Sequence, residues 1–270
     1  MLKRITWFSL LIITAAGFVA LSIGFFKAQQ VTGGRTPTAG KTIKTENIPT
    51  KTAAAAKESN AVRIVVMGDS VAKGTGDEKG KGFSGYLKDY LKNQTTKDIS
   101  VENIGIDGLK TDGLLERLQD QKLHSLIAAS DMVVISIGGN DLRVLRSRGD
   151  STKEAGFGNL EGIYLNNLKE LLKGVRKSST DTYIVFVGLY NPYLDAAASY
   201  EDTQLVSTWN YDTQRLIEAD PKAIFIPTYD IFKFSLNRFI ASDGLHPNSL
   251  GYQAISNRIA KSVENVFNGE

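Results

Sequence analysis

From Val62 onward, short runs of β-branched and other apolar residues alternate with longer amphipathic segments. This alternation is typical of repeated strand–helix units, which build a parallel sheet covered by helices on both faces. The apolar runs predict five strands, at residues 62–67, 99–104, 132–137, 183–187 and 223–226. We therefore expect a three-layer α/β/α sandwich around a five-stranded parallel sheet.

The segments between these runs predict the helices. They lie at residues 83–93, 111–130 (as one helix or two), 161–178, 203–219 and after Pro247. Within 161–178 five apolar residues fall near one face at helical spacing, which predicts that they are buried against the sheet. These residues are Ile163, Leu168, Leu171, Leu172 and Val175.

The N-terminus carries a long uncharged stretch. Lys3 and Arg4 precede residues 5–26, which as a helix would be about 33 Å long, enough to cross a bilayer. The flanking positive charges place the N-terminus in the cytoplasm and the rest of the chain outside. The alternative is a cleaved export signal, but 20–22 is a weak cleavage site and the stretch is long for a signal. We favour an uncleaved single-pass transmembrane helix over residues 1–27.

Residues 28–60 are rich in Thr, Lys, Ala and Gly and contain almost no large apolar side chain. Such a segment cannot offset its ordering entropy by burial, so we expect a flexible linker. Residues 61–270 remain for one globular domain, which is long enough for a sizeable core.

Composition excludes several kinds of chemistry. The chain has no cysteine, so it has no disulfide, thiolate ligand or thiol nucleophile. Residues 1–60 carry eight basic and two acidic residues, which leaves 24 basic and 27 acidic residues for the globular part. A net-acidic domain argues against nucleic-acid binding, whereas a basic arm suits an anionic membrane surface.

Parallel sheets of this kind bind ligands at the carboxyl ends of their strands. The first predicted strand runs into Gly68-Asp69-Ser70, which places a hydroxyl where a following helix can direct its N-terminal dipole. Taken alone, this tripeptide is more typical of a turn or a helix cap.

Two further strands end in residues that suit an oxyanion site. Gly105 lets the backbone approach a ligand and present its N–H. Asn140 follows two glycines and can donate its amide to a developing negative charge. Each of these segments alone is also typical of a turn.

The loop near the C-terminus contains Asp243 and His246. Across one short turn this spacing lets the carboxylate hold the imidazole tautomer whose Nε2 accepts a serine proton. The second histidine, His124, stands in a polar helical context with no evident partner, so we expect a surface or structural role for it.

These blocks, in this order, resemble the SGNH/GDSL hydrolase family over the chain from about Val62 to the C-terminus. The resemblance implies a flavodoxin-like fold with Ser70 as nucleophile and His246 with Asp243 as its base. It also implies an oxyanion hole made of the Ser70 and Gly105 N–H groups and the Asn140 side chain. Gly74 and Asp141 fit the family pattern as well.

The run after the fourth predicted strand, residues 188–192, resembles a bacterial subgroup of lipases and acylhydrolases. That likeness makes Tyr190 and Asn191 candidates for the substrate pocket, with Asp69 beside the nucleophile as a third. It implies a serine esterase or acylhydrolase, lipase-like or lysophospholipase-like, that forms an acyl-enzyme on Ser70. We expect a monomer with no metal and no organic cofactor.

The substrate stays open among lipid esters, carbohydrate O-acyl groups of envelope polymers and thioesters. Arg143, Arg146 and Arg148 form either an anion-binding loop or a solvated surface. The aromatic residues of the loops are either an acyl-pocket wall or packing residues, namely Phe157, Tyr164, Tyr190 and Tyr193.

Two alternatives come from other functional classes. One is a non-catalytic module that binds a glycan or a lipid, but it predicts the loss of at least one catalytic block, and none is lost. The other is a nucleotide-binding domain with the same architecture. Residues 68–76 lack the glycine spacing of a phosphate-binding loop, which disfavours it.

Overall fold

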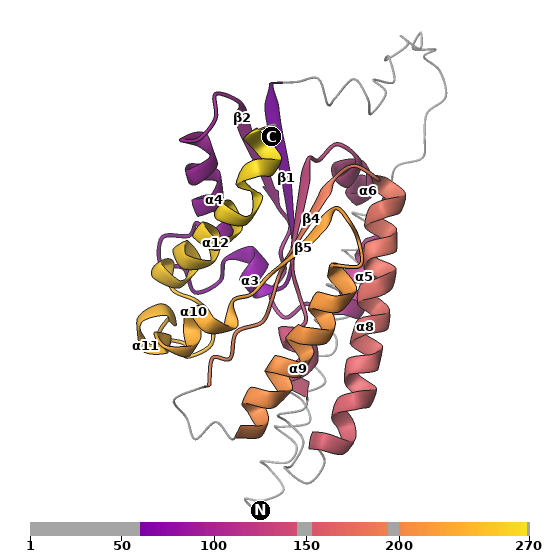
Figure 1. Ribbon diagram of the computed structural model, residues 1–270, viewed down its shortest axis with the longest axis vertical. Coiled ribbons are helices and arrows are strands. Elements are labelled where there is room, and N and C mark those ends of the chain that lie inside the picture. The colour runs from indigo at the N-terminus through magenta and orange to yellow at the C-terminus, as the bar shows by residue number, and fades with distance from the viewer. Residues whose placement is uncertain (1–59, 145–152, 194–199, 269–270) are drawn as a thin grey trace, which may run out of the picture. The chain divides into compact units, whose positions relative to one another are not determined.

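The computed structural model describes residues 60–144, 153–193 and 200–268. Its centre is one parallel sheet of five strands in the order β2-β1-β3-β4-β5 (Figure 1), which is the flavodoxin-like order. The strands are β1 (Ala61–Gly68), β2 (Asp98–Asn103), β3 (Met132–Ser136), β4 (Tyr183–Val187) and β5 (Ala223–Ile226). The three-layer sandwich with five parallel strands is therefore confirmed.

One face of the sheet is covered by α4 (Gly82–Lys92) and α12 (Ser249–Asn268), which pack against each other. On β1 the residues Val62, Ile64 and Val66 point into this layer, as the period of two of a strand requires. They meet a buried set from the two helices that includes Phe83, Leu87, Tyr252 and Ile255. Burial of each large apolar side chain contributes roughly 1.5–3 kcal/mol.

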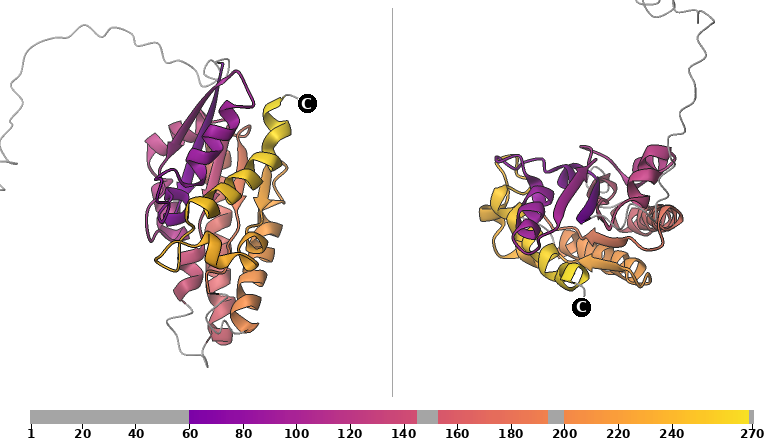
Figure 2. Two further views of the ribbon diagram at one scale, coloured as in Figure 1. Left: turned by 90° about the vertical axis from the view of Figure 1, so that its left-hand side faces the viewer. Right: turned by 90° about the horizontal axis from the view of Figure 1, so that it is seen from above.

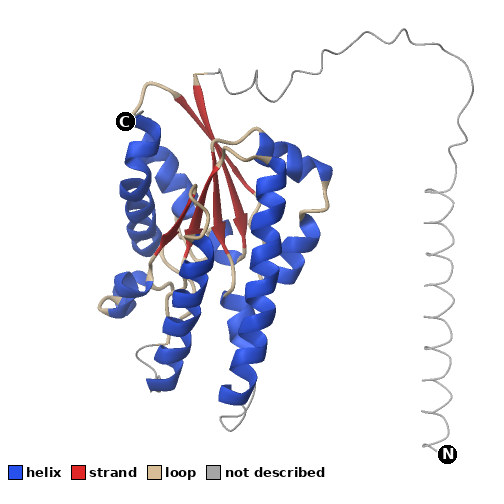
Figure 3. Ribbon diagram, turned by 45° about the vertical axis from the view of Figure 1, so that its right-hand side comes forward, coloured by secondary structure: helices blue, strands red, loops and turns tan. Residues whose placement is uncertain are grey.

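The opposite face is covered by α5 (Thr111–Arg117), α6 (Gln121–Ala128), α8 (Lys153–Ser178) and α9 (Tyr200–Ile217). The view from above in Figure 2 shows the strands between the two helix layers. Figure 3 shows α8 and α9 continuing past the carboxyl ends of the strands. These two helices therefore extend on the side of the sheet where a site is expected.

The predicted buried face of the helix over 161–178 needs one correction. Leu168, Leu171, Leu172 and Val175 are buried, but Ile163 is 52% exposed. Tyr164 is buried in its place and stacks on Trp209 at 4.2 Å between ring centroids. Tyr164 stands four residues before Leu168, which keeps it on the same helical face.

Four short helices were not predicted from the sequence. They are α3 (Ser70–Lys73), α7 (Gly139–Arg143), α10 (Tyr229–Lys233) and α11 (Leu236–Phe239). Helices of four or five residues are too short to show a hydrophobic period, and a helix this short draws its stability from tertiary packing.

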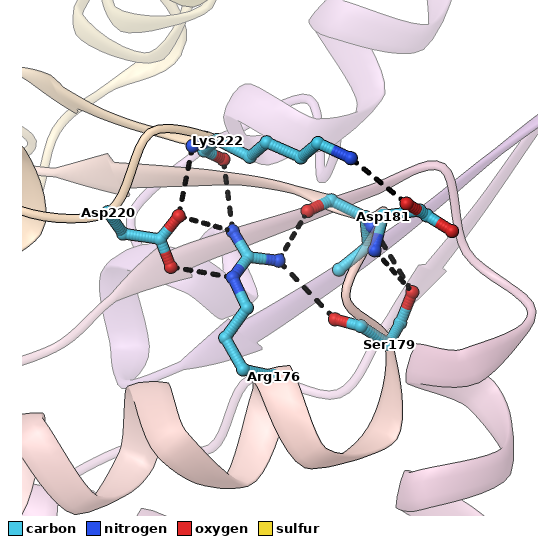
Figure 4. Close-up of polar contacts among 6 residues, drawn as sticks. Arg176, Ser179, Asp181, Asp220 and Lys222 are labelled. Carbon is cyan, nitrogen blue, oxygen red and sulfur yellow. Dashed lines mark hydrogen bonds and ion pairs between the residues drawn. The ribbon is translucent and has the colours of Figure 1, made fainter.

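At the amino end of the sheet, Arg176 joins α8 to the strand connections (Figure 4). Its guanidinium forms a bidentate pair with Asp220, at 2.6 and 3.0 Å, and also donates to the carbonyl of Thr182 at 2.7 Å. The pair is about four-fifths buried. It holds the helix layer to the end of the sheet that lies away from Ser70.

The predicted anchor (1–27) and nearly all of the predicted linker (28–60) lie outside the described residues, as do Arg146 and Arg148. None of the helices that the structure does describe is both long enough and apolar enough to cross a membrane.

Candidate active site

The turn after β1 brings Ser70 to the carboxyl end of the sheet. Gly68 has φ +139°, and a Cβ there would lie 1.8 Å from the carbonyl oxygen of Ser136, so only glycine fits between β1 and β3. The Asp69 carboxylate then caps α3 by accepting from the backbone N–H of Val71 at 2.9 Å. Ser70 is the first residue of that helix.

The loop before α12 is a self-supporting turn around Asp243. One oxygen of Asp243 accepts from the backbone N–H groups of Leu245 and His246, at 2.9 and 3.0 Å. The other accepts from the His246 Nδ1–H at 2.6 Å. Burial alone would raise the pKa of Asp243, but these hydrogen bonds outweigh it and lower the pKa. The carboxylate therefore stays ionised and fixes the tautomer in which Nε2 is free to accept a proton.

The two loops bring Ser70 and His246 into contact. The Nε2 of His246 lies 2.9 Å from the Oγ of Ser70. Gly76, with φ +91°, lies directly against the histidine: a Cβ at this position would be 2.6 Å from the Cβ of His246. The predicted serine, histidine and aspartate thus form one hydrogen-bonded chain.

Of the three predicted oxyanion donors, the Asn140 side chain and the Gly105 N–H already donate to other groups of the protein. The Asn140 side chain is in the wall of the pocket beside Ser70, and its Nδ2 donates to the carbonyl of Leu109 at 3.0 Å. An amide carries two hydrogens, so one remains for a ligand. The Gly105 N–H donates to Asn103 Oδ1 at 3.0 Å. Gly105 would reach an oxyanion only by sharing that hydrogen.

Two buried carboxyl groups lie behind the nucleophile. Burial raises the pKa of Asp69 to about 7, against the hydrogen bonds from Val71 and Ala72 and helped by repulsion from Asp141. Burial also raises the pKa of Asp141, which accepts from the hydroxyl of Thr111 at 2.6 Å. Asp141 thereby joins α7, which carries Asn140, to the start of α5.

A pocket of about 120 Å³ opens beside Ser70 and His246. Its wall combines the turn at Ser70 and the loop after β4 with α7, α9 and the His246 loop. Most of its side chains are apolar or aromatic, among them Val71, Leu142, Leu189, Tyr190, Pro192, Tyr193, Leu205, Val206 and Leu245. Leu205 and Val206 were not predicted to line a pocket, because apolar residues on one face of a helix such as α9 have the same spacing whether they line a pocket or pack in the core.

Asp69, Tyr190 and Asn191, the three residues predicted for the pocket, all line it. The Tyr190 hydroxyl donates to the carbonyl of Leu245 at 2.7 Å. Asn191 is buried and accepts from the backbone N–H of Tyr193 at 3.0 Å, which leaves its Nδ2 without a partner among the described residues.

The other loop residues separate into two groups. Tyr193 and Arg143 line the pocket. Tyr164 and Phe157 instead pack around Trp209, so for these two the packing alternative holds.

A contact missed from the sequence anchors the start of α12 to the loop that follows Ser70. The Ser249 hydroxyl donates to Asp77, and its backbone N–H donates to Glu78 at 3.0 Å. No local pattern links residues this far apart in the chain. The contact ties the serine loop to the helix that follows His246.

His124 has a partner that the sequence did not indicate, because its Nδ1 lies 2.5 Å from the hydroxyl of Ser178 on α8. This contact is structural and lies away from Ser70. Within the described ranges, no group of three His, Asp or Glu side chains is arranged to hold a metal ion.

Comparison with known proteins gives a family match. The model of the GDSL-like lipase/acylhydrolase family matches residues 66–254. An uncharacterized Bacillus subtilis protein, YpmR, is 28% identical over 84% of this chain and 91% of its own length. The spore germination lipase LipC of Bacillus licheniformis is 26% identical over 73% of this chain and 94% of its own length.

Two solved structures share the fold. The lipase Lip_vut3 from a goat rumen metagenome superposes with a TM-score of 0.69 and 23% identity, covering 74% of this chain and 97% of its own. The family 3 carbohydrate esterase of Clostridium thermocellum has a TM-score of 0.57 and 17% identity, covering 77% of this chain and 98% of its own. At these identities the likeness concerns the fold alone.

Proposed function

Because the chain belongs to the GDSL-like lipase/acylhydrolase family and is an ester-hydrolysing enzyme, we propose that it cleaves carboxylic esters through an acyl-enzyme on Ser70. One observation carries this proposal. Ser70 Oγ, His246 and Asp243 form a continuous chain of hydrogen bonds, 2.9 and 2.6 Å long, at the mouth of a pocket. The family match argues against the two alternatives from other classes, a non-catalytic module and a nucleotide-binding domain.

In the proposed first step, Ser70 Oγ attacks the ester carbonyl carbon while its proton passes to His246 Nε2. The ionised Asp243 stabilises the imidazolium that forms. His246 then donates the proton to the leaving alcohol oxygen as the ester C–O bond breaks. Water attacks the acyl-enzyme with His246 again as base, which releases the acid and restores Ser70.

The tetrahedral intermediate carries a negative oxygen that needs donors. The Asn140 amide lies in the pocket wall next to Ser70, which supports it as a donor together with the Ser70 N–H. Gly105 contributes in this proposal by sharing the hydrogen that it now gives to Asn103. A single oxyanion donor is worth about 3–4 kcal/mol of barrier reduction.

The pocket favours an acyl chain longer than acetyl. Its wall is mostly apolar, and its volume of about 120 Å³ is close to that of a cavity known to hold benzene, so it suits roughly four to six carbons. We therefore propose acyl-lipid or simple ester hydrolysis of the lipase type. The relative LipC, named a lipase, supports this choice.

Removal of acetyl groups from a carbohydrate is the second candidate. The fold shared with a carbohydrate esterase supports it, and so does Arg143 in the pocket wall, which suits a polar or anionic alcohol. In this case the apolar pocket would stay largely unfilled by the acyl group.

A p-nitrophenyl ester series from acetate to octanoate separates the two candidates in the purified full chain. Lipase-type activity predicts that kcat/KM rises to butyrate or hexanoate, whereas an acetyl esterase prefers acetate. If Ser70→Ala hydrolyses the esters as fast as the wild type, the acyl-enzyme on Ser70 is wrong.

For localisation we propose that residues 1–27 anchor a monomer, with the catalytic domain on the outer side of the cell membrane. The uncharged stretch of residues 5–26 behind Lys3 and Arg4 supports this. The intact mass of the membrane-extracted protein tests it, because a cleaved signal would shorten the chain. Sedimentation of the purified protein in detergent tests whether it is a monomer.

A further inference from the structure

Tyr190 lies where the wall of the pocket meets the loop that carries the base. Its ring lines the pocket, and its hydroxyl donates to the carbonyl of Leu245, the residue before His246, at 2.7 Å. The ring stacks on the buried Phe232 at 4.2 Å between centroids. One side chain is thus in contact with the space for the acyl group and with the catalytic loop.

The His246 loop needs such an external support. Inside the loop, Asp243 holds the backbone of residues 245 and 246, and the Ala241 N–H donates to the His246 carbonyl at 2.8 Å. These bonds keep the shape of the turn but do not set its distance from Ser70. On the serine-loop side, that distance is held by Gly76 against His246 and by the Ser249 contacts with Asp77 and Glu78. On the pocket side it is held by the Tyr190 hydroxyl, which joins Leu245 to the loop after β4.

The hydroxyl is a permanent donor at this position. Burial, reinforced by neighbouring tyrosine and aspartate groups, raises the pKa of Tyr190 well above its usual value. The proton therefore stays on the oxygen throughout the pH range in which an esterase is assayed. A carbonyl can only accept, so the direction of the bond is fixed.

We propose that Tyr190 is a positioning residue that couples filling of the acyl pocket to the alignment of His246 with Ser70. An acyl chain that packs against the ring holds the ring in its present position. Through the hydrogen bond from its hydroxyl, the tyrosine then holds Leu245, and with it the neighbouring His246, in position. Small displacements of a base reduce the rate strongly, so kcat responds to chain length and not KM alone. The inference rests on the proposed acyl-enzyme on Ser70.

The Tyr190→Phe variant of the full chain tests the coupling, because it keeps the ring and removes the hydroxyl. The readout is the ratio of kcat for p-nitrophenyl hexanoate to kcat for the acetate, with KM measured for both. We expect the wild-type ratio to be several-fold and the variant ratio to fall about three- to ten-fold, the value of one hydrogen bond. The KM values should change little, since the apolar ring remains.

Tyr252→Phe is the matched control. The Tyr252 hydroxyl is also buried and donates at 2.7 Å to a backbone carbonyl, that of Thr75, but Tyr252 does not line the pocket. We expect this variant to keep the wild-type ratio. The coupling would be overturned if the ratio is unchanged in Tyr190→Phe, which means that kcat falls equally for both esters. It would also be overturned if the ratio changes equally in both variants. Ester hydrolysis that survives in Ser70→Ala would instead overturn the acyl-enzyme itself.

Discussion

The Nε2 of His246 lies 2.9 Å from the Oγ of Ser70, although 176 residues separate the two in the chain. The contact exists because β1 directs Ser70 to the carboxyl edge of the sheet and the last loop returns to that edge before α12. The Asp243 carboxylate completes the arrangement from within the same loop as the histidine.

Replacing Asp243 by Asn should reduce turnover far more than binding. An amide at this position can donate to Nδ1 and so favours the imidazole tautomer that cannot accept the serine proton. We expect kcat to fall by about a hundred-fold or more, with KM within a few-fold of the wild type. Steady-state kinetics on p-nitrophenyl butyrate measure both. A rise in KM with kcat intact would contradict the orienting role.

Gly76→Ala should displace His246. The glycine has φ +91°, and an added Cβ would be 2.6 Å from the Cβ of His246 and 2.9 Å from the carbonyl of Pro247. Because the histidine must move, we expect kcat to fall at least ten-fold.

Gly80→Ala is the matched control for Gly76→Ala, since Gly80 lies in the same loop with φ +65° and has open space around its Cβ position. It should cost about 1 kcal/mol of stability through backbone strain and leave kcat unchanged. Equal losses of kcat in the two variants would show that strain in the loop, and not contact with His246, is responsible.

Asp69 should make stability fall as the pH rises. Burial raises its pKa from 3.8 to about 7 in the folded chain. The folded state therefore holds the proton more tightly than the unfolded state does. The resulting stabilisation is complete at low pH and is lost between about pH 4 and 7.

Asp69→Asn keeps an oxygen to cap α3 but cannot titrate. We expect the wild type to lose stability relative to the variant as the pH rises from 5 to 8. Urea denaturation of both proteins at each pH measures the unfolding free energies. A difference that does not change with pH would contradict the raised pKa.

Arg176→Ala should destabilise the fold without affecting catalysis. The bidentate pair with Asp220 is largely buried, so its loss leaves an unpaired carboxylate and should cost about 2–4 kcal/mol. The hydrogen bond from Arg176 is the main cause that lowers the pKa of Asp220. The stabilisation from the ionised pair is therefore fully present when the pH is above the ordinary pKa of aspartate, and it is lost as the pH falls below that pKa. Urea denaturation at pH 7 measures the cost.

Lys222→Ala serves as the comparison for Arg176→Ala, because its ion pair with Asp181 is exposed and should be worth less than about 1 kcal/mol. A cost for Arg176→Ala no larger than that for Lys222→Ala would refute the structural role of the Arg176 pair.

The strands could be predicted closely from the sequence because buried parallel strands are continuous apolar runs. Those at 183–187 and 223–226 agree with the structure at both ends. It was harder to predict which side of a helix is buried. Ile163 and Tyr164 are neighbours that can both be buried by their apolar surface, and only the packing against Trp209 decides that Tyr164 is the buried one. The helix at 111–130 is two helices, with a break after Arg117.

The site residues could be proposed from the sequence because each stands at a strand end or in the last loop, where topology brings such residues together. The contacts that hold them were not predictable. Tyr190 with Leu245 and Asp77 with Ser249 join distant segments through ordinary residue types, so no local spacing marks them. The structure also shows Gly105 donating to Asn103, a detail that depends on one side-chain rotamer.

The central claim is that Ser70 is the nucleophile activated by His246, and covalent labelling tests it most directly. The full chain is treated with a fluorophosphonate, digested, and the modified residue located by mass spectrometry. Our account predicts one adduct, on Ser70, that is lost in Ser70→Ala and forms far more slowly in His246→Ala. An adduct on another residue, or a labelling rate unaffected by His246→Ala, would contradict it.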